Sequence, residues 1–335
     1  MRRRTVIRAA VIIVAALALL IGGILLFQKL ESDKNTETRG DMSEGFGQLR
    51  TVEWNGKTYR AKPAVTTLLI AGTDRHGDPD ATGSKEYRRG SPADFLLLLA
   101  IDHTDKKIHQ LQIDRDTMAD VTVLGVFGNE AGTRVMQICL AHYYGKTLED
   151  NAKYTVDAVS RLLDELADID GYYMIDYSTV PVLNDALGGV KVKMQYDMTS
   201  VHPEWKQGAE IELHGKDAED FVRSRMTIGS GTNEERMDRQ AEYMKKAIQK
   251  IKSRISADLE FGEDLLEKLK TYATTNITAK RLADEMNRAN SYEIMPIDHP
   301  EGEYGMDEND EYVEFHMREN AAAEWVLDHL YTVQD

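Results

Sequence analysis

The sequence predicts an α/β protein, built as an α/β/α sandwich and preceded by one N-terminal transmembrane helix. Short apolar runs with the length of buried strands alternate with segments whose apolar residues recur at helical spacing. A longer apolar run lies close to the N-terminus, directly after a group of arginines. The first observation predicts the fold class, and the second predicts the transmembrane helix.

The N-terminal apolar run covers residues 9–27 (AAVIIVAALALLIGGILLF). At a rise of about 1.5 Å per residue, it is close in length to the hydrocarbon layer of a bilayer. Residues 1–8 contain four arginines, and such a flank stays in the cytoplasm. A cleaved signal peptide is the alternative, but its apolar region would be shorter and a small-x-small cleavage site would follow. The sequence therefore favours an uncleaved single-pass anchor in a cell membrane, with the main domain outside.

Composition excludes several classes of partner and site. The formal charge of the chain is −16, and residues 31–335 alone carry 36 basic and 57 acidic residues, a charge of −21. So acidic a domain repels the phosphates of nucleic acids, and we expect no nucleic-acid partner. The single cysteine, Cys139, permits no internal disulfide and no cysteine-based zinc site. Its apolar surroundings at residues 135–140 predict a small core residue.

Strand signals dominate the first third of the main domain. Residues 28–50 are polar and are expected to form a linker. Asn55-Gly56 predicts a β-hairpin between residues 51–54 and 58–61, because both residues tolerate positive φ. Two short apolar runs, at residues 66–72 and 94–101, fit strands buried on both faces, although the leucines of the second also allow a helix. Residues 107–113 are a third strand candidate. A turn at 103–106 is expected to join the last two of these strands.

Helices appear later in the chain and alternate with further strands. Apolar spacing and capping residues predict helices at residues 152–166, 178–187, 233–253, 280–290 and 319–330. Further strands are expected at residues 172–175 and 190–194. Gly188-Gly189 is expected to end the second helix. The acidic segment 299–314 contains two glycines and is expected to be a loop.

Four clusters place charged side chains beside apolar chain, where a charge must be paired, bind a metal or lie at the rim of a site. The clusters are residues 71–75, residues 91–94, residues 114–117, and residues 222–225 followed by 235–240. Taken singly, Asp74 fits a turn residue, Asp94 fits a strand-edge cap, and Arg115 fits a local ion pair with the aspartates beside it. The helix arginines also fit a solvated basic face.

Taken together, the clusters favour a phosphate ligand. Arg223 and Arg225 would share one face of an expected strand, and Arg236, Arg239 and Gln240 share one face of an expected helix. These arginines are concentrated in an otherwise acidic domain, and the planar arginine fork suits phosphate recognition. Two aspartates at strand ends with four or more arginines are what a diphosphate with a magnesium ion would require.

In this order along the chain, the motifs resemble the LytR–CpsA–Psr (LCP) family of Gram-positive cell-envelope proteins. The resemblance runs from residue 66 to residue 251. It rests on Leu68–Asp74, the Asp94 strand, Arg115–Thr117, Asp185–Val190 (DALGGV), Arg223-x-Arg225 and Arg236-x-x-Arg239-Gln240. It implies an LCP-like catalytic domain with a central mixed sheet at residues 51–254. Residues 255–335 are then a C-terminal extension, expected to pack on that domain.

The resemblance implies a magnesium-dependent phosphotransferase. Such a protein takes a glycopolymer, such as teichoic acid or capsule polysaccharide, from a polyprenyl-diphosphate carrier and joins it to peptidoglycan through a phosphodiester. Its partners are this lipid-linked donor, the peptidoglycan acceptor and membrane lipid. By position, Asp74 and Asp94 would bind Mg²⁺. The diphosphate would be bound by Arg75, Arg115, Arg223, Arg225, Arg236, Arg239 and Gln240, of which Arg115, Arg223 and Arg225 are the expected catalytic residues.

The chain departs from the family pattern at several positions. Pro92, Phe95, Asp114 and Asn233 replace the usual residues, and Gln137 stands in the place of an expected lysine. With these changes, the protein could use a different lipid-linked donor from that of other family members. Two other function classes stay open. One is an isoprenoid-diphosphate hydrolase, in which water replaces the sugar hydroxyl. The other is a non-catalytic lipid-diphosphate binder or envelope regulator.

Overall fold

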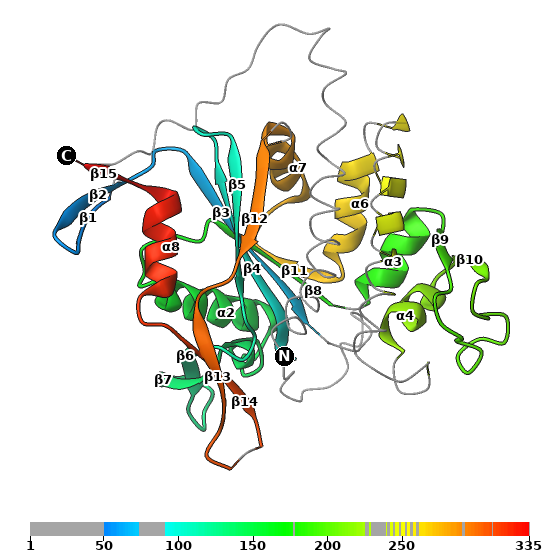
Figure 1. The fold of residues 1–335 in the computed structure, drawn as a ribbon, viewed down its shortest axis with the longest axis horizontal. Coiled ribbons are helices and arrows are strands. Elements are labelled where there is room, and N and C mark those ends of the chain that lie inside the picture. The colour runs from blue at the N-terminus through cyan, green and yellow to red at the C-terminus, as the bar shows by residue number, and fades with distance from the viewer. Residues whose placement is uncertain are drawn as a thin grey trace, which may run out of the picture. The chain divides into compact units, whose positions relative to one another are not determined.

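The computed structural model describes residues 50–73, 91–176, 178–224, 261–289, 292–309 and 311–334, with short runs between 228 and 258. These residues form two compact units (Figure 1). The strand-rich unit contains the described residues of 50–71, 91–173 and 292–334. The helical unit contains residues 72–73 and the described part of 174–289. The predicted anchor at 9–27 lies outside the described residues, and no helix within them combines the length and apolarity needed to cross a membrane.

The central sheet has six strands and is mixed, as the family resemblance implied. Its order is β11 (Ala273–Thr275), β8 (Gly171–Asp176), β3 (Val65–Thr73), β4 (Ala93–Asp102), β5 (Lys107–Ile113) and β12 (Glu293–Asp298). β4 pairs with β5 antiparallel, and β12 pairs with β5 parallel. The edge strand β12 comes from the predicted C-terminal extension, which therefore contributes to the sheet.

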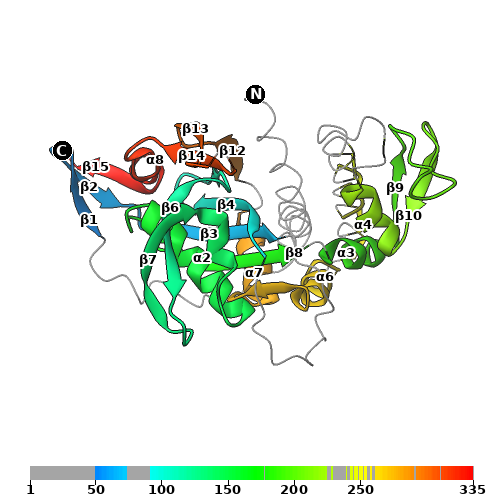
Figure 2. The ribbon, with the colours of Figure 1, turned by 90° about the horizontal axis from the view of Figure 1, so that it is seen from below.

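Strand β4 forms the centre of the core because its sequence is apolar on both faces. Its residues from Phe95 to Ile101 are each at most 1% exposed, as expected for a strand covered on two sides. Figure 2 shows helix α8 (Ala321–Leu330) on one face of β3 and β4 and α2 (Leu148–Leu162) on the other. The predicted strands at 66–72, 94–101 and 107–113 are confirmed, and so is the sandwich of helices around a sheet.

The predicted helices are confirmed within the described residues, with shifted ends. α2 begins four residues before the predicted start, because Thr147 and Asp150 form a reciprocal capping box there. α3 (Thr179–Ala186), α7 (Ala279–Arg288) and α8 match their predictions, and the described residues of 233–253 are helical. The helices α4 (Lys216–Arg223) and α6 (Phe261–Lys270) were not predicted.

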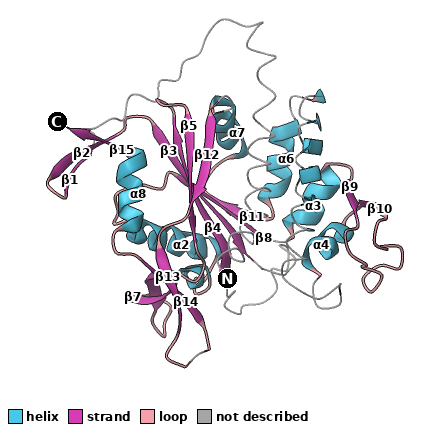
Figure 3. Ribbon diagram, viewed as in Figure 1, coloured by secondary structure: helices cyan, strands magenta, loops and turns pink. Residues whose placement is uncertain are grey.

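The described residues also form several smaller sheets (Figure 3). The predicted hairpin at 51–61 forms β1 (Thr51–Trp54) and β2 (Lys57–Ala61), and β15 (Tyr331–Gln334) adds a third strand. β9 (Val190–Lys193) pairs with β10 (Glu210–Leu213). After β5, the chain forms the hairpin β6 (Met118–Leu124) and β7 (Glu130–Gln137), and then the short 3-10 helix η3 (Ile138–His142).

The prediction of a loop at 299–314 is wrong, because this segment forms the hairpin β13 (Gly302–Met306) and β14 (Val313–Met317). Apolar and polar residues alternate in both strands, so one face of the hairpin can pack while its acidic face meets water. The prediction that Arg223 lies on a strand is also wrong, because it is the last residue of α4. In both segments, many charged residues make the regular spacing of the apolar residues hard to recognise in the sequence.

Candidate active site

Arg115 occupies a tight turn between β5 and β6, in the strand-rich unit. The Asp114 carboxylate accepts the backbone N–H of Asp116 at 2.9 Å, and the Asp114 carbonyl accepts the N–H of Thr117 at 3.1 Å. This local bonding is a common use of aspartate in turns. The Arg115 carbonyl in turn accepts the N–H of Cys139 at 3.1 Å. Hydrogen bonds to the backbone therefore hold the chain on both sides of Arg115, independently of the contacts of its side chain.

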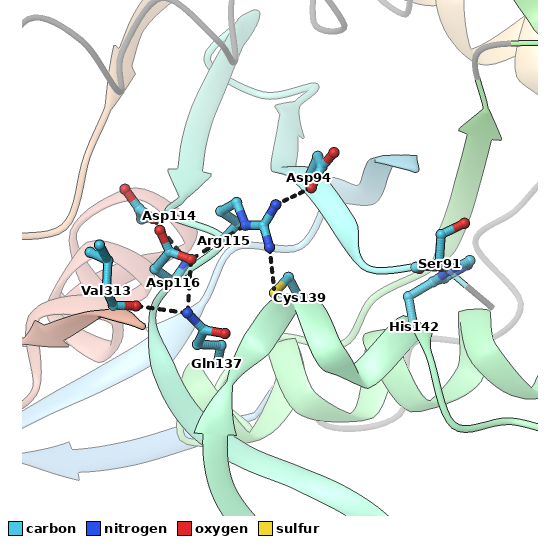
Figure 4. A network of polar contacts seen from close by, with 9 residues as sticks. All are labelled: Ser91, Asp94, Asp114, Arg115, Asp116, Gln137, Cys139, His142 and Val313. Atoms are coloured by element: carbon cyan, nitrogen blue, oxygen red, sulfur yellow. Dashed lines mark hydrogen bonds and ion pairs between the residues drawn. The ribbon is translucent and has the colours of Figure 1, made fainter. Parts of the chain in front are cut away.

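The guanidinium of Arg115 is held by three side chains (Figure 4). It donates to the Asp94 carboxylate at the start of β4. A second nitrogen donates to the Cys139 sulfur at 3.4 Å, and Nε lies 3.3 Å from the Asp116 carboxylate. The side chains of Arg115 and Asp94 are each about one third exposed, at 33% and 34%. The structure thus brings two of the predicted site residues, Asp94 and Arg115, into direct contact.

The charge state of this group follows from its surroundings. Burial by itself would lower the pKa of Arg115, but the Cys139 sulfur and the Asp94 and Asp116 carboxylates raise it, and the net shift is upward. Burial raises the pKa of Cys139 to about 11, although Arg115 acts in the opposite direction. At neutral pH the pair is therefore a guanidinium beside a neutral thiol. The prediction that Cys139 is a small core residue is confirmed, since it is fully buried.

The β13–β14 hairpin supports the turn from its other side. Phe315 donates its backbone N–H to the Asp116 carbonyl at 2.8 Å, and the Tyr304 hydroxyl donates to the Asp114 carboxylate. Gln137 Nε2 donates to the Asp116 carboxylate at 3.0 Å and to the Val313 carbonyl at 2.7 Å. Sequence reasoning missed this support. The alternation within β13 and β14 could have revealed the two strands, but not their contacts with the turn.

Two departures from the family pattern are explained by these contacts. Asp114 stands where the family pattern has a proline, and it binds Tyr304 of the hairpin. Gln137 stands in the place of an expected lysine, and it joins Asp116 to β14. Of the other departures, Phe95 is a core residue at 1% exposure. Asn233 lies outside the described residues.

The helical unit holds two further predicted site residues. Arg223 donates to Glu219 one helical turn earlier on α4, at 2.7 Å. Arg239 is 1% exposed and donates to the carbonyls of Phe221, at 3.1 Å, and Ser224. Arg239 thus holds the end of α4 in place. The other predicted site residues lie outside the described residues: Asp74, Arg75, Arg225, Arg236 and Gln240.

The DALGGV motif builds this same part of the helical unit. The Asp185 carboxylate accepts the N–H of Gly215, which caps α4, at 2.6 Å. The buried Asn184 donates to the Leu213 carbonyl at 2.7 Å. Gly188 and Gly189 have φ of +74° and +88°, a left-handed conformation that glycine adopts without strain. The motif therefore positions α4 and its terminal Arg223.

The donor chemistry at Asp94 fits a magnesium ligand, since Mg²⁺ prefers carboxylate oxygens at a partly exposed position. The start of β4 is fixed by His142, whose Nδ1 lies 3.0 Å from the Ser91 carbonyl. The second predicted ligand, Asp74, lies outside the described residues. Within the described residues, no group of three or more His, Cys, Asp or Glu side chains is arranged to hold a metal ion.

Several known proteins resemble this chain. A curated relative, the polyisoprenyl-teichoic acid–peptidoglycan teichoic acid transferase TagU of Halalkalibacterium halodurans, is 27% identical over 182 residues. The match covers 54% of this chain and 52% of that protein, so the chain spans about half the length of this relative.

Solved structures share the fold. Protein gbs0355 of Streptococcus agalactiae aligns with a TM-score of 0.54 at 18% identity, covering 79% of this chain and 86% of that one. TagV of B. subtilis aligns with 0.51 at 20% identity, covering 80% and 96%. A structure of TagT bound to LI-WTA aligns with 0.50 at 19% identity, covering 80% and 90%. The family model LytR_cpsA_psr matches residues 25–326, most of the sequence. The chain therefore belongs to the LytR_cpsA_psr family.

Proposed function

We propose that this protein is a membrane-anchored phosphotransferase that moves a glycopolymer from a polyprenyl-diphosphate carrier to peptidoglycan. The observation that carries the proposal is the Arg115 guanidinium, held between the Asp94 and Asp116 carboxylates at a partly exposed turn. The teichoic acid transferase activity named for the TagU relative supports this substrate class, and the TagT structure is named as bound to LI-WTA.

Arg115 has the properties that a diphosphate-binding residue needs. Its pKa is raised, so it stays cationic throughout the physiological range. Its planar fork can donate to two phosphate oxygens at once. The diphosphate of the lipid-linked substrate would accept the Arg115 N–H groups that now donate to Asp94. The Asp94 carboxylate would then be available to the metal. Bound Mg²⁺ would neutralise charge on the diphosphate, with Asp94 and Asp74 as its proposed ligands.

The proposed reaction is a single displacement at phosphorus. The acceptor hydroxyl attacks the phosphorus that carries the glycopolymer, and its oxygen forms the new phosphodiester bond. The bond from that phosphorus to the bridging oxygen breaks, polyprenyl phosphate leaves, and the hydroxyl proton passes to solvent or a base. The protein's share is positioning and charge neutralisation. We propose that Arg75, Arg223, Arg225, Arg236 and Gln240 bind the diphosphate with Arg115, while Arg239 supports α4.

The proposed location follows from residues 9–27 and the arginines before them. Protease added outside intact cells or protoplasts is expected to digest the chain after residue 31. Protection of the main domain from that protease would overturn the export proposal without affecting the proposed chemistry.

The proposed activity is tested by a product assay with a lipid-linked donor, Mg²⁺ and glycan acceptor. The wild-type protein is expected to form a phosphodiester-linked product only when acceptor is present. Asp94→Asn is expected to lose about 10²–10³-fold in rate, typical of losing a group that organises transition-state charge. Asp120→Asn, at an exposed position on β6, serves as the matched control.

The alternatives give different products in the same assay. Release of free glycopolymer phosphate without acceptor would identify a diphosphate hydrolase. Tight donor binding without either product would identify a non-catalytic binder. Equal rates for Asp94→Asn and Asp120→Asn would remove Asp94 from the mechanism.

A further inference from the structure

The turn between β6 and β7 exposes two apolar side chains that the candidate active site does not use. Val126 is 97% exposed and Phe127 is 89% exposed, the two highest values among the large apolar residues of the described chain. We call this pair the apolar tip. Turn positions usually carry glycine, asparagine, aspartate or proline, and neither side chain of the tip is part of the core. Adjacent apolar side chains exposed in this way are typical of a surface that binds an apolar partner.

The apolar tip is held in a defined turn. The Gly128 N–H donates to the Gly125 carbonyl at 2.8 Å, and the Gly125 N–H donates to the Asn129 carbonyl at 2.8 Å. These bonds close a turn with Val126 and Phe127 at its two central positions. Because the backbone of the turn is already ordered, binding of the tip costs little conformational entropy.

The hairpin that carries the apolar tip is attached to the core. Arg161 of α2 donates from Nε to the Asp120 carbonyl and from Nη2 to the Thr122 hydroxyl, both at 3.0 Å. Strand β6 is therefore bound to α2, which covers one face of the central sheet (Figure 2). β6 begins just after the Arg115 turn and has 7 residues, so at about 3.3 Å per residue the tip lies within roughly 25 Å of that turn.

The charge around the apolar tip is unlike that of the rest of the chain. Residues 121–129 contain no charged residue, although residues 31–335 together carry a charge of −21. A Cβ added at Gly128 would lie 2.9 Å from Lys146 Nζ, so the ammonium group of an exposed lysine lies directly beside the turn. A cation beside exposed apolar side chains suits the phosphates of lipid headgroups.

The acidic residues near the tip already interact with positive charge. The Glu130 carboxylate, at the start of β7, lies 3.4 Å from Lys153 Nζ. Glu149 and Asp150 lie in the first turn of α2, where the helix dipole compensates negative charge, and Asp150 also forms the capping box. These acidic groups therefore oppose the approach of a phosphate-bearing surface less than unpaired carboxylates would.

A lipid bilayer is an apolar surface within reach of the tip. The expected anchor ends at residue 27 and the described chain begins at residue 50, so at most roughly 80 Å of fully extended chain separates them. Such a covalent link keeps the bilayer at a high effective concentration around the domain. Valine and phenylalanine gain free energy when they leave water for the bilayer interface, while a lysine beside them reaches the lipid phosphates.

We infer that the apolar tip inserts into the same membrane that anchors the chain, and that this second contact orients the strand-rich unit on the bilayer. The inference rests on the anchor of the proposed function, but not on the transfer chemistry. With the tip inserted, the Arg115 turn lies within roughly 25 Å of the headgroups. The proposed diphosphate site then stays close to the surface that carries a lipid-linked donor.

The test uses the full-length protein in vesicles of phosphatidylcholine and phosphatidylglycerol that contain nitroxide-labelled acyl chains, which quench a nearby fluorophore. The single native cysteine, Cys139, is buried, so a thiol-reactive fluorophore attaches only to an introduced cysteine. The label on Val126→Cys is expected to be quenched by the lipid. Val333→Cys is the matched control, because Val333 is 51% exposed on β15, outside this hairpin, and its label is expected to stay unquenched.

A second substitution shows whether the side chains of the tip, and not the fluorophore, cause insertion. Adding Phe127→Ser to the Val126→Cys protein should shift the ratio of inserted to free tip about ten-fold toward the free form, because one aromatic side chain no longer leaves water. Thermal melts check that all variants fold. Quenching that Phe127→Ser leaves unchanged would overturn the inference.

Flotation of the vesicles on a density gradient reports the anchor separately, because it requires only residues 9–27. Equal quenching at positions 126 and 333 in a protein that floats would overturn the inference and keep the anchor. A protein that does not float would overturn the anchor and this inference with it. Quenching at position 126 in a protein that fails the transfer assay would keep the membrane contact and reject the transferase.

Discussion

At the scale of single residues, the turn that carries Arg115 depends on side chains that the family pattern does not contain. Asp114 and Gln137 each bind the turn and the β13–β14 hairpin together. A proline at position 114 could not accept the Tyr304 hydroxyl through its side chain. Both residues that depart from the family pattern therefore connect the turn to the hairpin.

Gln137→Leu tests this support. It removes two hydrogen bonds, each worth about 0.5–1.5 kcal/mol, so we expect the free energy of unfolding to fall by roughly 1–3 kcal/mol. Gln207→Leu is the control, because Gln207 is exposed and makes one main-chain bond. Urea titrations of both variants measure the difference. Equal small losses in the two variants would show that Gln137 does not hold the turn.

Cys139 should be inert in the folded protein. Burial raises the pKa of its thiol to about 11, and alkylation requires an accessible thiolate. We expect no measurable labelling by iodoacetamide at pH 8 in buffer and full labelling in denaturant, read by intact mass. Rapid labelling of the native protein would contradict the buried geometry at Arg115.

At the scale of elements, the strands and helices that could be predicted are those whose apolar residues follow a clear pattern in the sequence. The short apolar runs of β3 and β4 fit strands buried on both faces, although from the sequence alone the leucines of β4 also allow a helix. The β13–β14 hairpin was missed because its exposed face is acidic and its glycines resembled loop residues. The alternation of Arg223 and Arg225 predicts a strand only when the α4 residues before them are left out. From such patterns, the sequence predicts candidate site residues within single segments, but not the contacts between segments.

The family resemblance assigns Asp94 and Arg115 to one site, but their direct ion pair was not predicted. Asp94 begins β4 and Arg115 follows β5, and the antiparallel register of these strands places the two ends together. The support from Tyr304 and Gln137 joins residues far apart in sequence. No local signal contains that pairing.

The two glycines of the DALGGV motif give a matched test of an element boundary. At Gly188, φ is +74° and an added Cβ would meet no atom within 4 Å. Gly188→Ala should therefore lower the free energy of unfolding only by the energy of placing alanine in a left-handed conformation, about 1–2 kcal/mol. At Gly189, φ is +88° and the Cβ would lie 2.6 Å from His214 Cε1. Gly189→Ala should therefore be the more destabilising variant in thermal melts. The reverse order would contradict the structure of this segment.

At the scale of the whole molecule, a buried ion pair ties the β2–β3 connection to the end of β4. Lys62 Nζ lies 2.7 Å from the Asp102 carboxylate, which is 1% exposed. Burial by itself would raise the pKa of Asp102, but Lys62 and the N–H groups of Asp105 and Thr104 lower it, and the net shift is downward. A carboxylate with a lowered pKa stabilises the fold above its unfolded pKa and loses that contribution as pH falls through its folded pKa.

We therefore expect the free energy of unfolding to fall with pH below about 4, the unfolded pKa of aspartate. Lys62→Met should lose roughly 1.5–3 kcal/mol at pH 7, the range for a hydrogen bond to a charged group, and should depend less on pH in the acid range. Lys57→Met, at an exposed position on β2, is the control. Urea titrations at pH 7 and pH 3 give both quantities. An unchanged acid dependence in Lys62→Met would remove this pair as its cause.

The most direct test of the proposed active site is titration of an isoprenoid diphosphate against Arg115→Ala and Arg254→Ala. Arg254 lies with its guanidinium carbon 4.9 Å from the Phe261 ring centroid and has no proposed role in binding. Loss of a charge-assisted contact of roughly 1.5–3 kcal/mol should weaken binding to Arg115→Ala by about ten- to a hundred-fold, while Arg254→Ala binds like wild type. If both variants bind the diphosphate equally well, Arg115 does not bind phosphate, and the proposed transfer mechanism is contradicted.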